Sequence, residues 1–160
     1  MWSRRRVLAG AACLPLAGCG FAPVYGPGGG GLALRGAVRA RGAEDAEGFA
    51  FVRRLEERLG RPEAPRYDLL YALAMEEEGL AIDGSDNITR FSVEGRLDWR
   101  LVPAAGGEPV LAGSEGAFTG YSAPASTIST LASRRDAERR LAIILADQVA
   151  TRLLAAAPAL

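Results

Sequence analysis

Apolar and polar residues alternate most regularly between Arg90 and Leu101. The apolar set comprises Phe91, Val93, Leu97, Trp99 and Leu101. The polar set comprises Arg90, Ser92, Glu94, Arg96, Asp98 and Arg100. Because successive side chains of a strand point to opposite faces, this pattern predicts an antiparallel strand with one face in the core and the other in solvent. Turn-forming residues on both sides bound the strand.

Three further strands are predicted along the chain, at about Leu32–Val38, Tyr67–Ile82 and Val110–Tyr121. In the second segment alternation favours a strand, whereas its Ala, Leu, Met and three consecutive glutamates favour a helix by propensity. We predict a strand, because a clear strand follows at hairpin distance. Gly113 and Gly116 are expected to interrupt or bulge the last strand.

Apolar residues at helical spacing predict two helices. The first covers about Asp45–Gly60, with Phe51, Val52, Leu55 and Leu59 on its apolar face. The second is expected to begin at the capping-box pattern Ser133-Arg134-Arg135-Asp136 and to run to about Ala156. Its apolar stripe is expected to comprise Leu141, Ile144, Leu145, Val149 and Leu153. Its solvated residues are expected to include Arg139, Arg140, Asp147 and Arg152.

The order of these elements is β-α-β-β-β-α. It predicts an α+β fold, a single two-layer domain at residues 32–160, with two helices packed on one face of a mostly antiparallel four-stranded sheet.

The N-terminus has the pattern of an export signal. Three arginines, Arg4–Arg6, precede an uncharged stretch that is too short to span a bilayer and ends at Leu16-Ala17-Gly18-Cys19. This ending resembles the lipobox of bacterial lipoproteins. The resemblance implies a signal peptide at residues 1–18 and a Cys19 that carries diacylglyceryl and acyl groups. An ordinary secretory signal is the alternative, and the export route, general secretory or twin-arginine, is left open.

Residues 19–31 are expected to form the lipidated Cys19 and a tether rich in glycine and proline, because Gly26–Gly31 has little to bury. Lipoproteins are commonly retained in the inner membrane by Asp after the cysteine. Gly20 stands there instead, and the resemblance therefore points to the outer membrane.

Composition limits the function classes. The chain has no His, and its 19 basic residues are all Arg. Removing the three signal arginines from these 19 leaves 16 against 19 acidic residues, which argues against nucleic-acid binding. Without His, and with Cys19 acylated, triads and zinc clusters are excluded. We therefore expect no enzyme, no metal and no cofactor beyond the covalent lipid.

Residues 18–26, Gly-Cys-Gly-Phe-Ala-Pro-Val-Tyr-Gly, resemble the start of the LptE family of lipopolysaccharide-assembly lipoproteins in alphaproteobacteria, with Val24 for the commoner Leu. Segments 67–82, 88–101 and 135–154, together with Tyr121, resemble later parts of the family. The resemblance implies a protein on the periplasmic side of the outer membrane that is partner and plug of the β-barrel LptD and contacts lipopolysaccharide.

Arginine binds phosphate through paired hydrogen bonds, and lipopolysaccharide is anionic. The candidate contacts with lipopolysaccharide or the barrel are Arg90, Arg96, Arg100, Arg134 and Arg135. Ordinary solubility is the competing explanation for these arginines. The competing function is a lipoprotein accessory to a lipid or solute transporter, which should contain a closed apolar pocket.

Overall fold

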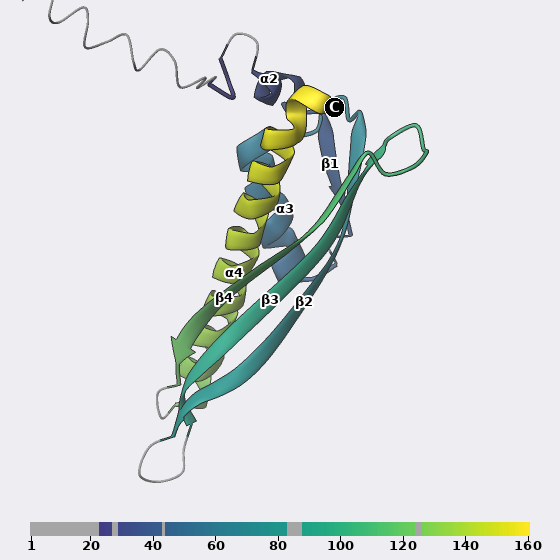
Figure 1. Ribbon diagram of the computed structural model, residues 1–160. Coiled ribbons are helices and arrows are strands. Elements are labelled where there is room, and N and C mark those ends of the chain that lie inside the picture. Colours follow the sequence, from purple (N-terminus) through teal and green to yellow (C-terminus); the bar gives the residue numbers. More distant parts are fainter. Residues whose placement is uncertain (1–22, 27–28, 43, 83–87, 124–125) are drawn as a thin grey trace, which may run out of the picture.

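The computed structural model describes residues 23–26, 29–42, 44–82, 88–123 and 126–160 (Figure 1). Within these residues the elements in chain order are α2 (Gly30–Leu34), β1 (Val38–Arg41), α3 (Ala46–Leu59), β2 (Tyr67–Ile82), β3 (Ile88–Pro103), β4 (Leu111–Ser122), α4 (Thr127–Ala156) and the 3-10 turn η2 (Ala157–Ala159).

The four strands form one sheet in the order β1-β2-β3-β4. β1 is parallel to β2, and the other two pairings are antiparallel. α3 and α4 lie against each other on the same face of this sheet (Figure 1). The predicted α+β layout, with two helices over a mostly antiparallel sheet, is therefore confirmed.

The two faces of β3 follow the predicted alternation. Val93, Leu97, Trp99 and Leu101 are buried on the helix side. On the outer face only Ser92 departs from the prediction, since it is buried and its hydroxyl donates to the carbonyl of Thr119 at 3.4 Å. Gly95 lies on the inner side, where an added Cβ would stand 2.9 Å from Leu141 Cδ2. The glycine thus lets α4 approach the sheet closely.

β4 is more regular than predicted. Its register with β3 runs without a shift from Leu111 to Ser122, so the expected bulge is absent. Gly113 has a packing role instead, because a Cβ there would come within 2.8 Å of the Trp99 ring. The glycine leaves space for the largest side chain of the strand core.

α3 has the predicted bounds. Asp45 caps its start by accepting from the Gly48 N–H at 2.6 Å, and Gly60 ends it with a positive φ of 83°. Phe51, Leu55 and Leu59 are buried against the sheet and α4.

α4 begins earlier than predicted. Its N-cap is Ser126, so the residues of the expected capping box at Ser133 lie inside the helix. Ile144 was placed in the apolar stripe, but it is 39% exposed, because the turn of the helix puts it on the side away from the buried face, which Ala142, Ala146 and Ala150 complete instead. Asp147 is not simply solvated, since it pairs with two arginines of α3. The fully buried members of the stripe are Leu141, Leu145, Val149 and Leu153.

The start of the domain also differs from the prediction. Leu32 and Leu34 lie in helix α2, and the first strand begins only at Val38. Gly30 and Gly31, expected in the tether, belong to the same helix, with Gly31 buried. The hydroxyl of Tyr25 donates to the Arg58 carbonyl at 3.1 Å. These described parts of the tether segment are therefore docked on the domain.

Candidate functional site

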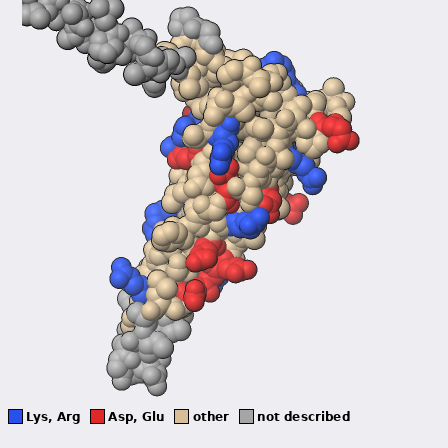
Figure 2. All heavy atoms as spheres, viewed as in Figure 1, with Lys and Arg blue, Asp and Glu red and all other residues tan. Residues whose placement is uncertain are grey.

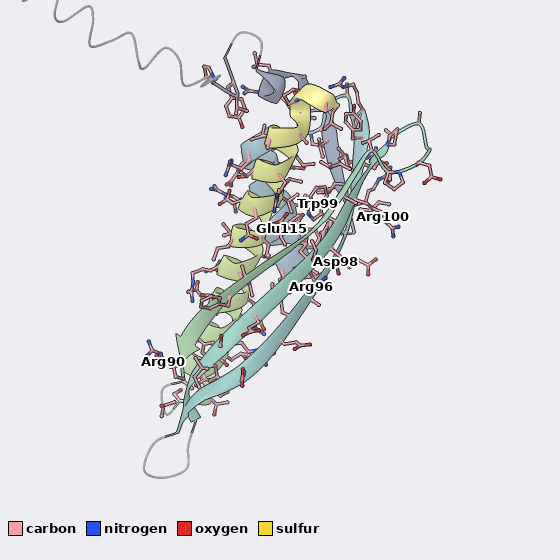
Figure 3. All side chains as sticks on the ribbon, viewed as in Figure 1. Arg90, Arg96, Asp98, Trp99, Arg100 and Glu115 are labelled. Atoms are coloured by element: carbon pink, nitrogen blue, oxygen red, sulfur yellow. The ribbon has the colours of Figure 1, made fainter. Side chains whose placement is uncertain are left out.

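The three predicted arginines of β3 share its outer face but stand far apart along the strand (Figure 3). Arg96 pairs with Asp98 at 3.3 Å, and both side chains are exposed. Hydrogen bonds from Ser114 and from Arg96 lower the pKa of Asp98. The charge of Arg96 is thus balanced locally. Arg100 has no ion pair within the described residues, and it lines an open depression of about 340 Å³ on the outer face.

Arg134 belongs to a set of ion pairs and hydrogen bonds that joins α4 to the sheet. It pairs with Glu138 at 2.9 Å and with Glu77 at 3.2 Å. Glu77 also accepts from the Tyr121 hydroxyl at 2.9 Å. Burial, together with this hydrogen bond, raises the pKa of Tyr121 to about 12. Arg134 therefore ties α4 to the sheet and has less capacity for an external anion than an unpaired arginine.

Arg90 and Arg135 belong to the same end of the molecule. Arg90 stands near the start of β3, at the hairpin end of the sheet, and Figure 3 shows it there. Arg135 lies in the first third of α4, whose residues 127–136 contribute nothing to the buried core. Both arginines are exposed and form no ion pair within the described part of the chain. These two side chains are the predicted candidates best placed to meet an external anion.

Exposed apolar side chains accompany these two arginines. Ile128 is 83% exposed and Leu131 is 47% exposed, both in the unburied start of α4. Spacings of three and four residues place Ile128, Leu131 and Arg135 on one helical stripe. Leu80, at the end of β2, is 60% exposed. We refer to these five residues as the distal tip: Leu80, Arg90, Ile128, Leu131 and Arg135.

The apolar half of the distal tip was missed by the sequence analysis. The predicted strand ends at Tyr121 and the predicted helix begins at Ser133, so Ile128 and Leu131 belong to no predicted element. Their spacing to Arg135 was the signal that could have revealed a longer helix. Chemically, apolar side chains beside guanidinium groups can contact an amphiphile that carries both acyl chains and anionic groups.

The opposite end of the molecule holds the described start of the chain. α2 lies against the last turns of α4 and η2, near the C-terminus (Figure 1). α4 has 30 residues, and at 1.5 Å per residue it is about 45 Å long. The chain segment that follows Cys19 therefore enters the domain roughly one helix length from the distal tip. Cys19 itself lies outside the described residues.

The described residues were also compared with what a ligand pocket, a metal site or a membrane-spanning helix would require. A depression of about 500 Å³ between β4 and α4 is lined by Trp99, Glu115 and Arg152; the last two form an ion pair at 3.3 Å in which the Arg152 side chain is exposed and that of Glu115 is mostly buried. The described residues include no group of three or more His, Cys, Asp or Glu placed to hold a metal ion. One described helix, Thr127–Ala159, is long and apolar enough to cross a membrane, but half of its most apolar 18-residue window is buried in the domain. It is the core helix of this fold.

Comparison with known proteins decides the family. The model of the family LptE, described as lipopolysaccharide-assembly, matches residues 36–153. The chain belongs to the LptE family. The matched residues include β1, α3, the whole three-stranded antiparallel part of the sheet and most of α4.

Solved structures share the fold of this LptE-family chain. A candidate lipoprotein from Caulobacter crescentus CB15 has 22% identity and a TM-score of 0.65, and covers 79% of this chain and 93% of its own. Rare lipoprotein B from Shewanella oneidensis has 10% identity and a TM-score of 0.57, with 74% and 92% covered. A minor lipoprotein from Acinetobacter baumannii has 14% identity and a TM-score of 0.54, with 74% and 89% covered. A sequence search of curated proteins found no match.

Proposed function

We propose that this LptE-family protein is an outer-membrane lipoprotein, anchored by acyl groups on Cys19, that serves as partner and plug of the LptD β-barrel in assembly of lipopolysaccharide at the cell surface. The observation that carries the proposal is the separation of its two ends. The chain segment after Cys19 enters at one end, and the distal tip lies at the other.

The length of the domain fits this task. α4 is about 45 Å long, and a bilayer with its headgroups is about 40–45 Å thick. With its lipid in the inner leaflet and its long axis along a barrel lumen, the domain would carry the distal tip to the level of the outer leaflet. Its own length, rather than an extended tether, supplies the reach.

The outer face of the sheet fits the wall of a barrel lumen. Barrel interiors are polar, and this face carries Arg96 and Arg100 beside the small residues Ala72, Ala74 and Ala112, with Leu70 and Phe118 as exposed apolar side chains. Small side chains let a second surface approach closely. We propose that Arg96 and Arg100 contact the barrel, and that Arg134 acts mainly by fixing α4 on the sheet.

The distal tip fits the anionic amphiphile itself. Arg90 and Arg135 would bind phosphate groups of lipopolysaccharide, while Ile128 and Leu131 would contact its acyl chains. No covalent chemistry is required of the protein, and we propose no enzymatic role. The alternative, an accessory to a lipid or solute transporter, calls for an enclosed apolar pocket, and the depressions described above are open and carry charged residues.

Photocrosslinking in cells tests the orientation. A photoreactive phenylalanine at Ile128 should crosslink to lipopolysaccharide, and one at Ala112 on the outer face should crosslink to LptD. The same residue at Leu32, an exposed position of α2, serves as the control and should give little of either product. Lipopolysaccharide crosslinked equally well from Leu32 would refute the proposed direction.

Depletion tests the role. Loss of the protein should lower the amount of assembled barrel and make cells sensitive to hydrophobic antibiotics. Normal barrel levels and normal surface lipopolysaccharide after depletion would exclude the assembly role and favour the transporter accessory.

A further inference from the structure

β2 has a long edge without a neighbouring strand. β1 pairs with it only at Tyr67–Leu70, whereas β2 continues to Ile82 (Figure 1). Beyond Leu70 the strand is therefore bonded to β3 alone. An unpaired edge presents a row of backbone donors and acceptors to which another extended chain can add.

The register identifies the backbone groups at this edge. The Tyr67 N–H donates to the Ala37 carbonyl at 3.0 Å, so Tyr67 directs its backbone away from β3. Backbone direction alternates along a strand, and the pairing with β3 is regular from Tyr67 to Gly79. Leu73, Met75 and Glu77 therefore direct their N–H and C=O groups to the open edge. Within the described residues these backbone groups have no partner.

The side chains behind the edge hold it in place. Leu73 and Met75 are half-buried and packed against the hydrophobic core. Glu77 is bound by the Tyr121 hydroxyl and by Arg134. The edge is thus an ordered strand that needs no rearrangement to accept a partner, which lowers the entropic cost of binding.

Negative charge surrounds the edge. Glu76 stands directly opposite Glu94 of β3, and Glu78 follows on the same outer face. All three are exposed and form no ion pair within the described part of the chain. Figure 2 shows acidic side chains gathered over this part of the sheet. Like charges that face each other across a ladder are destabilising, and a cationic partner would relieve that repulsion.

We propose that the free edge of β2, from Leu73 to Glu77, binds an extended basic segment of a partner protein by strand addition. Arginine or lysine side chains of the segment would meet Glu76, Glu78 and Glu94 on the outer face. The apolar side chains that alternate with them along the segment would pack beside Leu73 and Met75 on the inner face. Pairing with a second copy of this chain is disfavoured, because it would bring two rows of glutamates together. The inference is independent of lipopolysaccharide binding at the distal tip.

A synthetic peptide tests the proposal on the full chain in mild detergent. The probe is a fluorescent nine-residue peptide of alternating valine and arginine, and a valine–glutamate peptide is its control. Fluorescence anisotropy should show at least tenfold tighter binding of the basic peptide. Its binding should slow amide exchange of Leu73, Met75 and Glu77 at least tenfold. No binding at millimolar peptide, or protection confined to other strands, would overturn the proposal.

Two sets of variants separate strand addition from general attraction. Met75→Pro removes a donor at the open edge, where proline is tolerated, and should abolish binding. If this variant does not fold, Glu76→Gln with Glu78→Gln keeps the test, and it should weaken binding at least fivefold. The matched control, Glu63→Gln with Glu108→Gln, changes the net charge equally at exposed positions elsewhere and should leave affinity unchanged.

Two outcomes of these experiments count against the assignment. Equal weakening by the two glutamine pairs would reduce the effect to net charge and overturn it. Sedimentation that reveals a concentration-dependent dimer, with the same amides protected in the absence of peptide, would assign the edge to a second copy instead.

Discussion

The two parts of α4 differ in what surrounds them, although they belong to one continuous helix. From Ala137 to Leu154 the helix buries nine residues against α3 and the sheet. From Thr127 to Asp136 it buries none, and Ile128 and Leu131 are exposed. The same residue types thus stabilise the fold in one part and form a surface in the other. Apolar character alone does not tell these roles apart; the opposing layer does.

The largest expected effect comes from the buried part. Leu145→Ala should lower the free energy of unfolding by about 2–5 kcal/mol, because Leu145 is fully buried and its loss leaves a cavity. Ile128→Ala is the matched control on the same helix and should change it by less than about 0.5 kcal/mol. Urea denaturation of both variants measures the difference. Similar losses would mean that the start of α4 is packed against something in solution.

A second test probes how closely the buried part of α4 approaches the sheet. Gly95→Ala should destabilise by about 1–3 kcal/mol, since its Cβ would press on the fully buried leucines of α4. Gly116 lies nearby on β4, and a Cβ added there would stand no closer than 3.9 Å to another atom. Gly116→Ala should therefore be neutral or slightly stabilising. Thermal unfolding of the two variants decides, and equal melting temperatures would contradict the close approach.

The charged contact between α3 and α4 should act in a defined pH range. Burial opposes ionisation of Asp147, but hydrogen bonds from Arg54 and Arg58 outweigh it and lower its pKa. A carboxylate with a lowered pKa stabilises the fold above its ordinary titration range and loses that contribution as the pH falls through its value in the folded protein. Asp147→Asn should therefore cost about 1–2 kcal/mol at pH 7, and the gap between wild type and variant should narrow below about pH 4.

Urea unfolding at pH 7 and pH 3 measures this gap. A gap of the same size at both pH values would show that the asparagine disturbs packing rather than a charge interaction.

The elements predicted well from the sequence are those in which the spacing of apolar residues reflects one buried face. β3 alternates because one layer of helices covers one side of it, and α3 has both a cap and a stop in the chain, Asp45 and Gly60. The start of α4 was missed because its residues face no layer, so they carry no stripe tied to the core. α2 was missed because five residues are too few to show a period, and its glycines resemble a linker.

The candidate site was predictable only in part, for a related reason. Positive charge on the outer face of β3 is visible in the alternation, but which arginines are already paired depends on neighbours across strands and helices. Arg134 meets Glu77, 57 positions away, and no local pattern records that contact. Arg90 and Arg135 remain predictions as contact residues, now with apolar neighbours that the sequence had not joined to them.

Substitutions at the distal tip should have the smallest effect on stability of those considered, together with a clear effect on the binding of lipopolysaccharide. Ile128→Ser combined with Arg135→Gln removes one apolar and one cationic side chain that make no contact with the core. Each change should alter stability by less than about 0.5 kcal/mol. Their joint loss should weaken binding to lipopolysaccharide micelles about tenfold, the equivalent of about 1.4 kcal/mol. The matched control is Leu32→Ser with Arg61→Gln, at exposed positions of the other end, and should bind as wild type does. If both double variants bind equally well, the start of α4 is a solvated extension of a structural helix, and the contrast between its two parts has no bearing on lipopolysaccharide.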